Sequence, residues 1–154
     1  MTILRTPTPL LTSLHGRRFG LGHKGELIGN EKEITRPCVD ASITVGAEDT
    51  NVRAITIQLK DIDGNDINYR EMVEVYVLLD ANGDAFVVTG GSTGIAIGTD
   101  GALLTVVAKK MFVAISESDG DIDLTWTDTG TEAAYLLLRL PNGRLIVSDA
   151  LTNT

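Results

Sequence analysis

The sequence predicts an all-β fold, a sandwich or barrel of eight or nine short antiparallel strands that follow a different N-terminal segment. From Val52 to the C-terminus, short runs alternate apolar and polar residues, and turn residues separate them about every 8–12 positions. No convincing amphipathic helix accompanies them. A helix at residues 133–140 would lie between Gly130 and Pro141 and have about two turns, too few to be stable alone. A chain of 154 residues fits one domain with a real core.

Each predicted strand is justified by its pattern or by its flanking turns. The strands are expected at residues 52–60, 72–79, 85–89, 95–97, 102–107, 111–116, 122–126, 134–140 and 144–148. In the first, VRAITIQLK, aliphatic residues alternate with polar ones, which predicts a half-buried strand. In the second, MVEVYVLL, valines alternate with Glu74 and Tyr76. DIDGN, between these two strands, is a turn in which Gly64 can adopt a positive φ.

Asparagine, aspartate and glycine define the remaining turns. Asn82-Gly83-Asp84, between the second and third strands, is a strong hairpin signal because it is flanked by apolar runs. Asp100-Gly101 precedes the fifth strand, Asp119-Gly120 precedes the seventh, and Pro141-Asn142-Gly143 joins the last two. Trp126 lies on the inward face of the seventh strand and is interpreted as a core residue.

Residues 1–40 differ from residues 41–154 and are predicted to form an extended N-terminal arm ahead of the β domain. The arm mixes prolines, glycines and charges, and it shows neither the helical nor the strand period. Its apolar patches favour docking on another surface over a solvated linker. The candidate partner-binding residues are Leu10, Leu11, Leu14, His15, Arg17, Arg18, Phe19, Lys24, Leu27 and Ile28.

Charge is distributed unevenly along the chain. Residues 1–37 carry six basic and three acidic residues, so the rest carries seven basic and eighteen acidic residues, and the whole chain has a net charge of −8. An acidic domain repels nucleic acid phosphates, which are bound through Lys and Arg. The expected partner is therefore not nucleic acid, and the basic arm suits an acidic protein surface.

TGGSTGIA, at residues 89–96, matches two enzyme motifs, but neither has the context that its chemistry needs. As G-x-S-x-G it makes Ser92 a hydrolase nucleophile, but His15 and His23 both lie upstream, and no helix follows. As T-G-x-x-x-G-I-x it is similar to the cofactor loop of short-chain dehydrogenases, but Ala96 replaces the last glycine and the helix is again missing. The segment is interpreted as a glycine-rich turn, with no catalytic residue and no cofactor.

The Asp-rich runs DIDGND (61–66) and DGDID (119–123) offer the oxygen ligands that calcium prefers, but without the EF-hand pattern. Hairpin turns in which Asp and Asn bond their own backbone explain both runs, and calcium is the alternative. Zinc-like spacing is absent, so no metal site is predicted. Cys38 is interpreted as a packing residue, without a disulfide. Neither a signal peptide nor the roughly 18-residue apolar run of a membrane helix is predicted.

Four segments of the chain resemble small virion proteins of tailed phages. They are ITIQLKDIDGND (55–66), GIAIGTDGALL (94–104), SESDGDIDLTWT (116–127) and YLLLRLPNGRLIVS (135–148). LHGRRFGLGHKGELI, at residues 14–28, also resembles an arm of phage head proteins. The family is that of head-decoration, or capsid cement, proteins.

The resemblance implies an immunoglobulin-like β-sandwich that binds the outside of the capsid as a structural protein and not as an enzyme. Its arm would clamp neighbouring subunits of the major capsid protein, and the protein would be a homo-oligomer, often a trimer. It would be assembled in the host cytoplasm and reside on the outer surface of the virion. The alternatives are a head-fibre, tail-tube or tail-fibre component, or a carbohydrate-binding immunoglobulin-like module.

Overall fold

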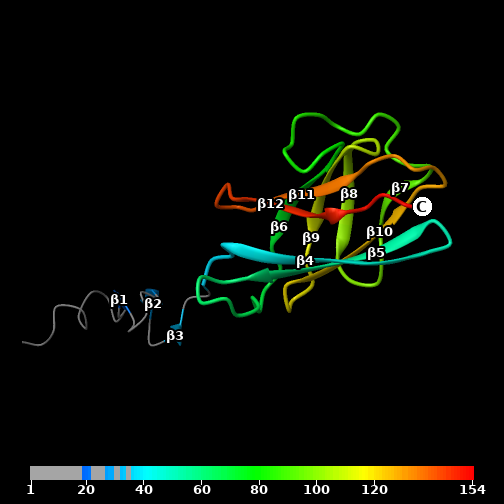
Figure 1. The fold of residues 1–154 in the computed structure, drawn as a ribbon. Coiled ribbons are helices and arrows are strands. Elements are labelled where there is room, and N and C mark those ends of the chain that lie inside the picture. Colours follow the sequence, from blue (N-terminus) through cyan, green and yellow to red (C-terminus); the bar gives the residue numbers. More distant parts are fainter. Residues whose placement is uncertain (1–18, 22–26, 30–31, 34–35) are drawn as a thin grey trace, which may run out of the picture. The chain divides into compact units, whose positions relative to one another are not determined.

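The computed structural model describes residues 19–21, 27–29, 32–33 and 36–154, and the chain divides into two compact units. The first unit, Met1–Arg36, contains a small antiparallel sheet of order β1-β2-β3. Its strands are β1 (Phe19–Leu21), β2 (Leu27–Gly29) and β3 (Lys32–Glu33) (Figure 1). The sequence pattern did not predict these strands, because each is only two or three residues long and alternation cannot be recognised over so few positions.

The second unit, Pro37–Thr154, is a sandwich of two antiparallel sheets (Figure 1). The four-stranded sheet has the order β4 (Asp40–Asp49), β5 (Val52–Lys60), β10 (Asp121–Thr127) and β7 (Gly94–Ile97). The five-stranded sheet has the order β12 (Leu145–Ala150), β11 (Tyr135–Arg139), β6 (Met72–Leu78), β9 (Met111–Ile115) and β8 (Ala102–Val107). The predicted all-β sandwich of eight or nine strands is confirmed. No helix capable of crossing a membrane is found in the part of the chain that the structure describes.

The strand order is immunoglobulin-like. In immunoglobulin constant domains one sheet has the order A-B-E-D and the other contains G-F-C. Here β4-β5-β10-β7 corresponds to the first order, and β12-β11-β6 corresponds to the second. The β8–β9 hairpin extends the second sheet beyond β6, and it follows β7 in the chain.

The core lies between the two sheets and is built by strict alternation along the central strands. In β10 the burial alternates at every residue, so Ile122, Leu124 and Trp126 point inward and are at most 1% exposed. The inward residues of β5, β6 and β11 meet them. The placement of Trp126 in the core is thereby confirmed. Cys38 is also buried, as the packing interpretation predicts, and burial followed by the nearby charge of Glu71 raises the pKa of its thiol.

In the second unit, two further elements differ from the prediction. The ten-residue strand β4 was not predicted, although Ala41, Ile43 and Val45 alternate there with Ser42 and Thr44, because Gly46-Ala47 and the acidic end of the run obscure the pattern. A β-bulge between Val45 and Glu48 marks the same interruption.

The strand expected at residues 85–89 is reduced to an isolated bridge between Leu78 and Phe86. The Asn-Gly turn itself forms, with Gly83 at a φ of 84°. After Val87, the backbone N–H groups of Val88 and Thr89 do not donate to a neighbouring strand. They donate to the side-chain carboxylate of Glu132 instead.

Candidate functional site

A single carboxylate, that of Glu132, holds the loop that contains the two enzyme-like motifs. It accepts hydrogen bonds from the backbone N–H groups of Val88, Thr89, Gly90 and Gly91, at N···O distances of 2.6 to 3.2 Å, and from the Thr89 hydroxyl. Burial opposes ionisation of Glu132, but the hydrogen bonds from Thr89, Gly91 and Val88 outweigh it and lower the pKa from 4.5 to about 2. Converging N–H groups of this kind form an anion-binding nest. In this protein the carboxylate of Glu132 occupies the nest.

Two glycines of the loop, Gly90 and Gly91, have no room for a side chain. Gly90 and Gly91 have φ values of 73° and 72°, and a Cβ on Gly90 would lie 2.5 Å from the Cβ of Lys109. A Cβ on Gly91 would lie 2.7 Å from the carbonyl oxygen of Thr127. The Lys109 ammonium also donates to the carbonyls of Gly91 and Ser92, each at 2.9 Å. The loop is therefore fixed from both sides.

Ser92 is bonded within this turn. Its hydroxyl donates to the Thr127 carbonyl at 3.4 Å and accepts from the Thr129 N–H at 3.2 Å. Its own N–H donates to the buried carboxylate of Asp128 at 3.1 Å. The chain continues into strand β7, whereas both enzyme motifs require a helix at this point. His15 and His23 lie outside the described residues.

The first Asp-rich run is a turn closed by Asp61. The Asp61 Oδ1 atom accepts the N–H groups of Asp63 and Asn65, at 2.9 and 3.0 Å. Gly64 has the positive φ expected from the sequence, at 81°. The interpretation of this run as a hairpin turn, in which Asp bonds its own backbone, agrees with the geometry.

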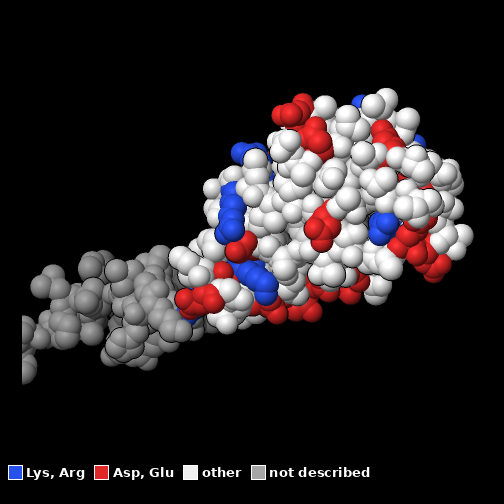
Figure 2. Space-filling model, in the orientation of Figure 1, with Lys and Arg blue, Asp and Glu red and all other residues white. Residues whose placement is uncertain are grey.

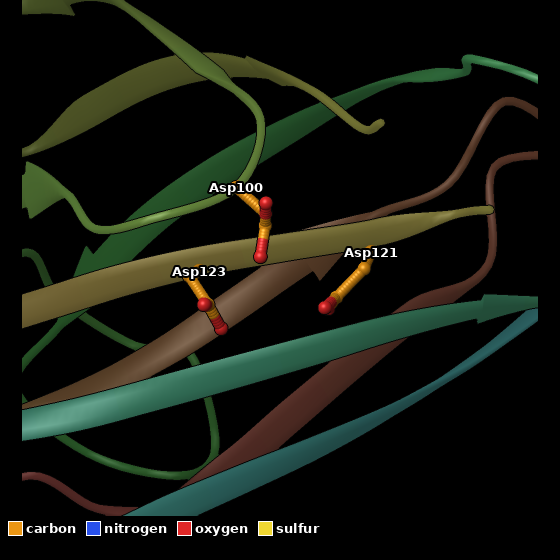
Figure 3. Close-up of side chains that lie close together, drawn as sticks. All are labelled: Asp100, Asp121 and Asp123. Carbon is orange, nitrogen blue, oxygen red and sulfur yellow. The ribbon is translucent and has the colours of Figure 1, made fainter. Parts of the chain in front are cut away.

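The second Asp-rich run contributes to a cluster of three carboxylates (Figure 3). Asp121 and Asp123 are two residues apart on β10 and point to the same outer face of the sheet, where Asp100, from the turn between β7 and β8, joins them. Their oxygen atoms lie within 4.8 Å of one another. Within the described part of the chain, this is the one group of three or more such side chains close enough to hold a metal ion. Asp100 was missed from the sequence because it belongs to a separate turn.

The electrostatics of this carboxylate cluster are unfavourable without a counter-charge. Burial raises the pKa of Asp121, and the charge of Asp123 and then those of Asp100 and Asp119 raise it further. The buried Oδ1 atom of Asp121 has no hydrogen-bond partner. Thr56 supplies one compensating hydrogen bond, to Asp123 at 3.0 Å. Three carboxylates are oxygen ligands of the type that calcium prefers, but they are fewer than its usual 6–8 ligands.

The outer face of the five-stranded sheet is apolar. Two cross-strand rows define this apolar face: Leu145, Arg139, Glu74, Val113 and Leu104, and then Val147, Leu137, Tyr76, Met111 and Val107. Leu104 is 66% exposed and Leu145 is 56% exposed. The outer face of the four-stranded sheet contrasts with it, because Thr, Gln, Lys and Asp side chains occupy most of the outward positions of β5 and β10.

A hollow of about 420 Å³ lies at one end of the apolar face. Its lining includes Tyr76, Phe86, Leu137, Arg139 and Leu145. The rings of Tyr76 and Phe86 have centroids 6.3 Å apart. Sequence reasoning missed this hollow because its residues come from two hairpins far apart in the chain.

The residues to which the sequence assigned partner binding lie in the first unit. Phe19, Leu27 and Ile28 fall in β1 and β2. The other seven lie outside the described residues: Leu10, Leu11, Leu14, His15, Arg17, Arg18 and Lys24.

Comparison with models of known protein families, with curated proteins and with solved structures finds no match to this chain.

The first prediction concerns the carboxylate that holds the glycine loop. Glu132→Gln lowers the free energy of unfolding at neutral pH by about 2 kcal/mol, because backbone N–H groups lose a charged acceptor. The pKa of Glu132 is lowered on folding, so its contribution is complete above pH 4.5 and is lost as the pH falls from there towards about 2. Chemical denaturation of both proteins across this pH range measures the difference.

Asp84→Asn is the matched control, since it removes an exposed carboxylate from the neighbouring loop. The difference in the free energy of unfolding between wild type and Glu132→Gln should decrease as the pH falls. The corresponding difference between wild type and Asp84→Asn should stay small at every pH. A gap for Glu132→Gln that does not change with pH contradicts the role of its charge.

The second prediction concerns the carboxylate cluster. In EDTA, Asp121→Asn raises the free energy of unfolding by about 1 kcal/mol, the size of one close like-charge pair in water. The pKa of Asp121 is raised on folding, so the wild type loses this increment as the pH rises above 3.8, whereas the variant does not. Asp84→Asn, which removes an exposed carboxylate that is not among the charges acting on Asp121, is the control. If calcium stabilises the wild type and Asp121→Asn abolishes that effect, the cluster is instead a cation site.

Proposed function

We propose that this chain is a structural virion protein that binds the outside of a tailed-phage capsid and stabilises it. The first unit, Met1–Arg36, is the arm that clamps neighbouring subunits of the major capsid protein, and the sandwich is the domain that this arm attaches to the head. Homo-oligomers, with trimers favoured, provide several such arms, because linked weak contacts give firm retention.

The observation that carries this proposal is that Pro37–Thr154 forms a compact unit with a hydrophobic core of its own. Among the residues whose burial the structure describes, the core cluster runs from Cys38 to Leu151, close to the C-terminus. Buried Asn153 fastens the same end of the chain, because its amide donates to the carbonyls of Asn51 and Asp128. A sandwich with a core of its own supports a separate role for the apolar and basic residues of the arm, that of binding another protein.

The surface of the sandwich also supports adhesion over catalysis. Figure 2 shows acidic side chains in several separate clusters on the face drawn, with basic ones between them and uncharged residues over the rest. Such a surface repels nucleic acid. Its negative charge is opposite to the positive charge of the arm, so the sandwich and the arm suit partner surfaces of different charge. The side chain of Ser92, the candidate nucleophile, takes part in holding its own turn.

The hollow on the apolar face favours a second candidate, a carbohydrate-binding module of a fibre or tail component. Two aromatic rings beside Arg139 are suited to stacking on a sugar ring and to hydrogen bonding of its hydroxyls. Binding of glycans by the full chain, lost in Phe86→Ala, is the result that selects this candidate.

The proposal predicts that removing residues 1–36 leaves a folded sandwich that no longer binds capsids. Heads purified from the encoding phage, grown without this protein, are mixed with either form and sedimented. The truncated form should keep a cooperative melting transition and lose affinity by about tenfold or more, at least 1.4 kcal/mol. Equal binding by the two forms, or no binding by the full chain, contradicts the proposal.

Substitutions within the arm test the contribution of its charge without removing the arm, in the same sedimentation assay. Arg17→Glu with Arg18→Glu should weaken capsid binding at low salt, and the difference should shrink at high salt as the charges are screened. Arg144→Glu, on the sandwich, changes the same type of charge and should have little effect. Binding that is insensitive to the Arg17 and Arg18 substitutions contradicts a role for the basic pair.

A further inference from the structure

The apolar face and the rest of the sandwich surface differ sharply in charge. Residues 38–154 contain eighteen acidic and seven basic residues. In the two rows of the apolar face, the charged side chains are Glu74 and Arg139, which pair with each other at 3.0 Å. The hydrogen bond from Tyr76, and next that from Arg139, lower the pKa of Glu74. The face is therefore both apolar and neutral, on a domain that is otherwise strongly acidic.

We propose that this face is a self-association surface, which packs against the same face of a second copy of the chain. Two copies of an acidic domain repel each other over most of their surface. They can approach closely where each presents a neutral apolar surface. A basic partner would be drawn instead to the acidic regions of the sandwich, so the charge distribution favours a second copy as the occupant of this face. The inference does not depend on the virion role.

The Glu74–Arg139 pair is compatible with a two-fold contact. In an isologous contact the same patch meets itself, so the patch must be complementary to its own copy. A two-fold axis near the pair places the carboxylate of Glu74 beside the guanidinium of Arg139 in the other copy. Each charge keeps its partner in its own chain and gains one across the contact.

Strand β8 borders the face and leaves this side of the sheet open. It is an edge strand of the five-stranded sheet, and its sequence ALLTVV contains no charge and no proline. Exposed edges are usually protected by such residues, or by bulges, and here only a bulge between Thr105 and Val107 is present. By contrast, β4, at the edge of the other sheet, carries Asp40, Glu48 and Asp49.

The area of the apolar face determines how strongly two copies are expected to bind each other. Five strands about 4.8 Å apart, each with two outward residues in the two rows, present about 300 Å², comparable to the largest apolar patch of a typical monomer. A standard protein interface buries about 800 Å² of accessible surface on each partner. The contact is therefore weak in dilute solution, and it strengthens when copies are held side by side.

Sedimentation velocity of the full chain, over a hundredfold range of concentration, tests the proposal. The mean mass of the wild type should rise with concentration. Leu104→Glu and Leu145→Glu place charges on the apolar face and should each raise the dimer dissociation constant by about tenfold or more. Both side chains are exposed, so folding should be preserved, which the melting temperature checks. Thr44→Glu, exposed on the outer face of the other sheet, is the matched control and should associate like the wild type.

A charge-swap pair tests the two-fold geometry. Glu74→Arg brings like charges together and should weaken the dimer, whereas Glu74→Arg combined with Arg139→Glu should restore it. The proposal is overturned if the wild type stays monomeric throughout, or if Leu104→Glu associates as strongly as Thr44→Glu. Failure of these tests leaves capsid binding by the arm unaffected, so the two proposals fail separately.

Discussion

Alternation along the central strands is the constraint on which the rest of this structure depends. Once Ile122, Leu124 and Trp126 of β10 turn inward to close the core, Asp121 and Asp123 on the same strand must turn outward. The same rule applies to each central strand that faces them. The alternation that buries the core therefore also determines which side chains lie on the two outer faces. The outer face of the four-stranded sheet is polar and acidic, and that of the five-stranded sheet is apolar.

Many of the acidic residues hold the turns that join these strands. Asp61 accepts two N–H groups of its own turn, and Asp80 accepts three, from residues 82, 83 and 84. Asp128 and Glu132 together bind the N–H groups of the loop at residues 88–92. A carboxylate used in this way stabilises the fold without needing a ligand. The cluster of Asp100, Asp121 and Asp123 differs, because there the carboxylates face one another.

The two proposals assign different tasks to different parts of the chain. The arm is proposed to bind the capsid, and the apolar face is proposed to bind a second copy. A decoration protein needs both kinds of contact if weakly attached copies are to support one another on the head. The glycine-rich loop takes no part in either, since its N–H groups already bind Glu132.

The sequence by itself determined the fold class and most of the strands, because period-two alternation and Gly-Asn-Asp turns are local signals. The strand at Val52–Lys60 was predicted to the residue, and the turn glycine Gly64 has the expected positive φ. Strand β4 and the loss of the strand at residues 85–89 escaped prediction. In the second case Glu132, more than forty residues away, competes for the same N–H groups.

Only the tertiary structure decided what the surface holds. Asp100 meets Asp121 and Asp123 because the β7–β8 turn lies against β10 in the folded sandwich. The rows of the apolar face align residues from five strands, and the register between strands is set by long-range pairing that no local pattern specifies.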